Sequence, residues 1–116
     1  MFINLTNHPS TGWSEEQWNA AQKYGKIIDI SFPIIEPFFS KTEVDELADI
    51  TVDSITGLDS NPVVHVMGEM TFTYAVVERL KAQGFVCVAS TTERLVKMTP
   101  DGKKISDFKF VQFREY

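Results

Sequence analysis

Side chains that bind anions or move protons gather at three places in the chain, each directly after an apolar run. Hydroxyl and amide groups donate hydrogen bonds to anionic oxygens, and the planar guanidinium of an arginine suits phosphate. An imidazole titrates near neutral pH, which makes His8 a candidate general acid or base. The three sets are Thr6, Asn7, His8 and Ser10; Gly68, Glu69 and Thr71; and Ser90, Thr91, Thr92 and Arg94.

Each of these assignments has a plainer alternative in the sequence. A loop histidine that bonds to the backbone explains His8 equally well. His65 lies inside the apolar run Val63–Met67 and is predicted to be a core histidine rather than a ligand. Glu69 opens a helix, where a carboxylate is favoured by the helix dipole without any ligand. No paired cysteines, closely spaced histidines or glycine-rich phosphate loop is present, so we predict no metal site and no bound cofactor.

Strand and helix patterns alternate along the first three quarters of the chain. Apolar runs of strand length are separated by segments with helical periodicity, and glycines or prolines mark the ends. Ser14 with Gln17 has the pattern of a capping box at a helix start. The predicted strands are 2–6, 26–32, 63–67 and 85–89, and the predicted helices begin near 14, 41 and 70 and end near 25, 55 and 83.

The pattern changes after residue 89. Pro100-Asp101-Gly102 predicts a tight turn, and residues 108–113 alternate like a strand. We therefore predict an α/β, Rossmann-like domain over residues 1–116, with a mostly parallel sheet, three helices and a C-terminal antiparallel hairpin. In such sheets ligands bind beyond the carboxyl ends of the strands, where the three polar sets lie.

The composition limits which classes of partner the chain is expected to bind. The net charge is −5, with three basic and twelve acidic residues in 1–78 and eight basic and four acidic in 79–116. The acidic total argues against binding to long nucleic acid, while the basic C-terminal part permits a local anion site. No apolar run approaches membrane-spanning length, and no signal-peptide pattern opens the chain. The single cysteine, Cys87, cannot form an internal disulfide, so we predict a cytoplasmic protein.

Several short motifs resemble small single-domain CRISPR-associated proteins of the CARF-like group, named for the CRISPR-associated Rossmann fold. The resemblance is carried by four short stretches that are spread over most of the chain. They are Asn7-His8-Pro9-Ser10 followed by Trp13 and Gln17, Val64–Glu69, Val88–Arg94, and Phe113-Arg114-Glu115-Tyr116.

This resemblance implies binding of a cyclic oligoadenylate, the second messenger of type III CRISPR antiviral defence. It implies a homodimer, with the two-fold symmetric ring lying across two strand-end clefts. Some members of the group are ring nucleases that need no metal, in which a ribose 2′-hydroxyl attacks phosphorus to give a 2′,3′-cyclic phosphate. On this basis His8 is the predicted proton carrier, Arg94 stabilises charge, and Ser10, Thr71 and Thr91 position the ligand.

Two other functions stay open. The chain is alternatively a noncatalytic module that sequesters or senses the nucleotide, since the same contacts serve binding and cleavage. It is also open that the chain is an interaction domain with no small ligand. The helix near 70–83 is apolar on more than one face, with Tyr74 and Val77 outside its main stripe, which favours a homodimer through this helix.

Overall fold

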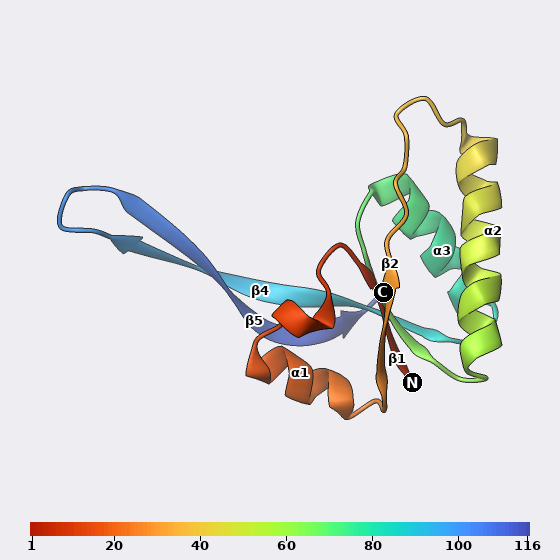
Figure 1. Cartoon of the computed structure of the whole chain (residues 1–116), viewed down its shortest axis with the longest axis horizontal. Coiled ribbons are helices and arrows are strands. Elements are labelled where there is room, and N and C mark those ends of the chain that lie inside the picture. The colour runs from red at the N-terminus through yellow and green to blue at the C-terminus, as the bar shows by residue number, and fades with distance from the viewer.

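A computed structural model describes all residues, 1–116, of the chain. Nine elements follow one another, beginning with a strand and ending with two long strands (Figure 1). They are β1 (Phe2–Thr6), the 3-10 helix η1 (Ser10–Gly12), α1 (Glu15–Gln22), β2 (Ile27–Ser31), α2 (Lys41–Leu58), β3 (Val63–Met67), α3 (Met70–Ala82), β4 (Val86–Met98) and β5 (Lys104–Glu115).

The five strands form one sheet in the order β2-β1-β3-β4-β5. The first four are parallel to their neighbours, and β5 pairs antiparallel with β4. The predicted fold class, a Rossmann-like α/β domain with a mostly parallel sheet, three helices and a C-terminal hairpin, is confirmed.

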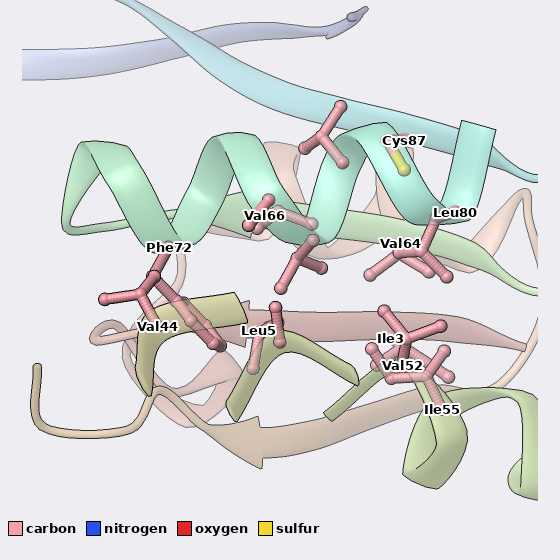
Figure 2. Packing of buried hydrophobic residues seen from close by; sticks show 14 residues of the cluster. Ile3, Leu5, Val44, Val52, Ile55, Val64, Val66, Phe72, Leu80 and Cys87 are labelled. Carbon is pink, nitrogen blue, oxygen red and sulfur yellow. The ribbon is translucent and has the colours of Figure 1, made fainter. Parts of the chain in front are cut away.

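The sheet is covered on both faces, but unequally. On one face α2 and α3 pack over the strands and enclose the main core, in which Ile3, Leu5, Val64 and Val66 lie fully buried (Figure 2). On the other face α1 covers a smaller cluster centred on Phe2. Strand residues alternate between the two faces, so β1 contributes Ile3 and Leu5 to one side and Phe2, Asn4 and Thr6 to the other.

Capping residues in the sequence predict where the helices begin. The Ser14 side chain accepts a hydrogen bond from the Gln17 backbone, as the sequence predicts, and Ser40 with Glu43 forms a complete capping box. The helix predicted to end near residue 55 continues through Gly57 to Leu58. A single glycine costs a helix only about 1 kcal/mol, which tertiary packing readily outweighs. No helix of the structure has the length and apolar character needed to cross a bilayer.

The separate hairpin strand predicted after residue 89 is also corrected. Val86–Met98 is one continuous strand, which pairs in parallel with β3 at its start and antiparallel with β5 from Val88 onward. A register shift between Thr91 and Thr92 marks a bulge at the point where the ribbon leaves the domain. Bulges increase local twist, so one bent strand runs from the parallel sheet into the hairpin.

Two glycine substitutions test the close packing beside β3. A Cβ on Gly68 would lie 2.3 Å from the Phe32 ring, which itself packs edge-on against Phe72. We expect Gly68→Ala to lower the free energy of unfolding by about 1–3 kcal/mol, because Phe32 must move out of a packed contact. Gly57→Ala is the control, since nothing lies within 4 Å of its Cβ.

In that control a helical alanine should raise stability by up to about 1 kcal/mol. Urea unfolding followed by circular dichroism measures both variants. Equal stability of the two variants would contradict the packing described for Gly68.

Candidate functional site

A cleft of about 960 Å³ opens on the α1 face of the sheet, beyond the ends of β1 and β3. One side comes from the loop between β1 and α1, which supplies His8 and Trp13. The other side comes from the β4–β5 ribbon, which supplies Phe108, Lys109 and Phe110. The volume lies within the range of small-ligand and cofactor sites. The structure holds no group of three or more His, Cys, Asp or Glu side chains arranged to bind a metal ion.

A row of three polar side chains crosses the sheet beside this cleft. Asp29, Asn4 and His65 are register partners at the centres of β2, β1 and β3. The Asn4 amide nitrogen donates to Asp29 Oδ1 at 2.8 Å, and its oxygen lies 3.1 Å from His65 Nδ1. Asn4 and His65 are both buried, so these bonds replace water contacts that the side chains lost on folding.

The same row holds the His8 loop by its backbone. The His8 carbonyl accepts hydrogen bonds from Asn4 Nδ2 at 2.9 Å and from Trp13 Nε1 at 3.1 Å. The His8 amide donates to Thr6 Oγ1 at 3.1 Å. The backbone of His8 is therefore fixed at both polar groups, while its imidazole is exposed and lines the cleft.

His65 is held in one tautomer. Because the Asn4 nitrogen faces the carboxylate of Asp29, the Asn4 oxygen must face His65, and Nδ1 of His65 must carry the proton. Nε2 is then an unprotonated acceptor, and it is buried with no hydrogen-bond partner. Burial, followed by the nearby charge of His8, lowers the pKa of His65 to about 4. The ring packs edge-on against Trp13 and Phe113.

Asp29 anchors the outer end of the row on the edge strand. Partial burial would raise the pKa of its carboxyl, but hydrogen bonds from Asn4 and from the Ser10 side chain and backbone outweigh this and lower it. Ser10 Oγ donates to Asp29 Oδ2 at 2.7 Å. A carboxylate that stays ionised keeps accepting from Asn4, and so keeps the amide of Asn4 in the orientation described.

Comparison with known proteins places the whole domain in one family. A family model described as the uncharacterized protein MJ1673 family matches residues 1–114. The chain belongs to this family. The match takes in the polar row, the cleft and the long ribbon together. No curated protein and no solved structure matches the chain.

Six of the residues predicted at the strand ends line the cleft together. They come from all three of the strands named by the sequence, so the strand ends do meet at one place. The six are Thr6, Asn7, His8, Gly68, Ser90 and Thr92. His65 also lines the cleft, so its prediction as a core histidine describes its burial but not its position.

The other five predicted residues do not line the cleft, because local structure uses their polar groups. Ser10 is buried against Asp29. Glu69 caps α3 by accepting from the Thr71 and Phe72 backbones, and Thr71 Oγ1 donates to the same carboxylate. Two lie on the ribbon: Thr91 Oγ1 donates to the Gln112 carbonyl, and the Arg94 guanidinium donates to Ser106 Oγ at 3.0 Å.

Sequence reasoning missed several residues of this site. Lys109 is the basic side chain in the cleft wall, although the ribbon lysines looked like a solvated surface. Trp13, Phe108 and Phe110 add aromatic area there. A signal for the polar row was present, since Asn4, Asp29 and His65 each interrupt the middle of a five-residue apolar strand.

The buried His65 makes a specific prediction about pH. Its folded pKa of about 4 lies below the unfolded value near 6.5, so the unfolded chain binds more protons between these values. Stability should therefore fall as pH falls from about 6.5 toward 4, by about 2 kcal/mol between pH 7 and pH 5. Urea unfolding at the two pH values measures this difference.

His65→Gln should remove most of the pH-dependent loss, whatever its effect on absolute stability. His8→Gln should keep most of it, because burial, the larger cause of the lowered pKa of His65, is unchanged in that variant. Carboxylates with lowered pKa values, such as Asp29, change the stability mainly below about pH 4, and both variants retain them. The same pH dependence in His65→Gln as in the wild type would show that His65 is not buried as a neutral group.

Proposed function

We propose that the chain binds a cyclic oligoadenylate in the α1-face cleft and cleaves it by a ring-nuclease reaction that needs no metal. One observation carries this proposal: the cleft brings the exposed imidazole of His8 and the ammonium of Lys109 together with three aromatic side chains. Aromatic faces stack on nucleobases, and a cation in the wall attracts phosphate. The resemblance to CARF-like proteins supports the choice of ligand.

The proposed reaction is an internal transesterification. A ribose 2′-hydroxyl attacks the adjacent phosphorus, the bond from phosphorus to the 5′-oxygen breaks, and a 2′,3′-cyclic phosphate and a 5′-hydroxyl result. His8 carries a proton between the 2′-hydroxyl and the leaving 5′-oxygen, and Lys109 stabilises the negative charge on the phosphorane. His65 stays neutral and does not serve as the proton carrier, because its pKa of about 4 makes it a weak base.

The proposed assembly is a homodimer in the cytoplasm. A two-fold symmetric ring is matched by two equivalent clefts, and closed two-fold dimers are the commonest form of homo-oligomer. Tyr74 on α3 is 69% exposed and is available to such an interface, whereas Val77 is 8% exposed and belongs to the core. A charged substitution at Val77 would therefore unfold the domain rather than dissociate a dimer.

The first test concerns the cations of the ribbon. We expect Lys109→Ala to weaken binding of cyclic tetra-adenylate roughly ten- to a hundredfold, because a charge-assisted contact is worth about 1.5–3 kcal/mol. Lys103→Ala is the matched control on the same ribbon, away from the cleft lining. Calorimetry with cyclic tri-, tetra- and hexa-adenylate measures both.

Arg94→Ala belongs in the same series, because the sequence predicts a role in the cleft and the guanidinium contacts Ser106 instead. If Lys109→Ala and Lys103→Ala bind equally well, the ligand lies elsewhere. If the wild type binds none of the rings, the chain is the interaction domain that the sequence left open.

The second test separates an enzyme from a sequestering module. In single-turnover assays with EDTA present, His8→Ala should slow cleavage about a hundred- to ten-thousandfold while affinity changes little, since general acid–base help is worth that much. His8→Gln is measured beside it to separate proton transfer from a hydrogen-bonded contact. Tight binding with an intact ring would identify the noncatalytic alternative, and undiminished cleavage in His8→Ala would remove His8 as proton carrier.

A further inference from the structure

The β4–β5 ribbon extends far beyond the body of the domain. We call residues 92–110 the arm, and Figure 1 shows it projecting away from the helices with its turn at the far end. Every residue of the arm is exposed or half-buried. The radius of gyration is 16.1 Å, whereas a compact chain of this length has about 13 Å. The arm therefore lacks most of the contacts with the body of the domain that normally stabilise a strand pair.

An arm of this kind needs contacts with another surface to be stable. An isolated two-stranded hairpin is marginally stable in water. Arg94 pairs with Phe108 and Met98 with Lys104, so Phe108, Val96 and Met98 share one face, while Leu95 and Ile105 lie on the other. Leu95 and Phe108 line the cleft at the base of the arm. Val96, Met98 and Ile105 are each about half exposed or more.

A second uncovered apolar surface lies beside α3. A groove of about 340 Å³ is lined by Met67, Met70, Tyr74 and Tyr116, above the buried Val77. Met70 is 83% exposed and Tyr74 is 69% exposed, so the groove has an apolar rim that nothing in this chain covers. The arm cannot fill the groove of its own chain. Ser90 contacts Met67 at the groove edge, but the strand then runs eight residues outward to Met98, a span of about 26 Å.

Charge favours contact between the arm and the body of another copy. The arm carries five basic and three acidic residues, a net charge of +2. The other residues carry six basic and thirteen acidic groups, a net charge of −7. Glu69 and Glu78, both exposed, lie at the start of α3 and along it. Two arms repel each other weakly, and two bodies repel each other strongly, so an arm on a body is the favoured pairing.

We propose that the arm of one copy seats the apolar face of its tip, formed by Val96 and Met98, in the α3 groove of a second copy, reciprocally about a two-fold axis. This exchange closes the dimer and covers both apolar surfaces at once. The inference relies on the proposed homodimer for its second copy but not on any ligand. Since each arm also forms a wall of its own cleft, docking holds that wall in place.

Disulfide trapping without ligand tests this arrangement. The native thiol of Cys87 is buried, and burial raises its pKa to about 11, so it stays unreactive. Met98→Cys and Tyr74→Cys are purified separately and mixed under mild oxidation. We expect a mixed disulfide between the two variants to exceed self-linking of either one. Self-linking of Tyr74→Cys alone would replace the arm with a helix-to-helix interface, and self-linking of Met98→Cys alone would indicate arm-to-arm pairing.

A second measurement uses the wild-type cysteine content. By sedimentation, Met98→Asp should raise the dimer dissociation constant roughly ten- to a hundredfold, because an apolar tip side chain no longer becomes buried. Ser54→Asp is the control, since it adds the same charge on an exposed part of α2. A monomeric wild type at tens of micromolar, or equal effects of both substitutions, would overturn the proposal. Calorimetric binding of cyclic oligoadenylate reports separately on the proposed function.

Discussion

The hydrogen-bonding capacity of one buried amide constrains most of this structure. Asn4 lies at the centre of β1, 1% exposed, and all of its polar capacity is used. Its nitrogen donates to Asp29 and to the His8 carbonyl, and its oxygen accepts from Thr6 Oγ1 and His65 Nδ1. A buried amide that loses a partner costs about 1–3 kcal/mol. A slip of β1 by one residue would break the two contacts that cross to β2 and β3, and it would turn Ile3 and Leu5 out of the main core.

The site inherits its geometry from that amide. The loop after β1 is held at the His8 carbonyl by donors from the sheet and from Trp13, so the loop is positioned before any ligand arrives. Groups positioned in advance lose little entropy on binding, which is the main advantage that a folded site has over the same residues in solution. The row also gives the two histidines different environments. His8 is exposed at the cleft, whereas His65 is buried, neutral and oriented.

The sequence predicts the fold well because its signals are local. Alternating apolar runs, serine caps and glycine stops mark the elements, and the fold class is confirmed. The continuity of residues 90–98 with the strand before them was not predicted, because a strand exposed on both faces has no alternation to detect. For the site, the sequence names the strand ends but not which of their side chains are already occupied. Glu69 and Thr71 bond to each other at the start of α3, and Ser10 bonds to Asp29. Such contacts depend on the register and on distant partners.

Lys109 and Arg94 show which part of the site the sequence does not predict. Both are basic residues on the same ribbon, and in sequence Arg94 is the one that follows a strand end directly. The register after the bulge at Thr91 pairs Lys109 with Glu93 and Arg94 with Phe108, so the two basic residues lie on opposite faces of the ribbon, and a bulge of this kind has no clear sequence signature. In the structure Lys109 lines the cleft while Arg94 bonds to Ser106 across the ribbon.

The cleft and the α3 groove are not independent surfaces. Met67 and Gly68 line both of them, and Ser90 at the base of the arm donates to Met67 Sδ at 3.1 Å. Gly68 is packed against the Phe32 ring, so no side chain beyond glycine fits there without a shift of that ring. A group docked in the groove would contact the same Met67 side chain as a ligand in the cleft. Met67 is thus common to both surfaces, and coupling between two sites requires such a shared element.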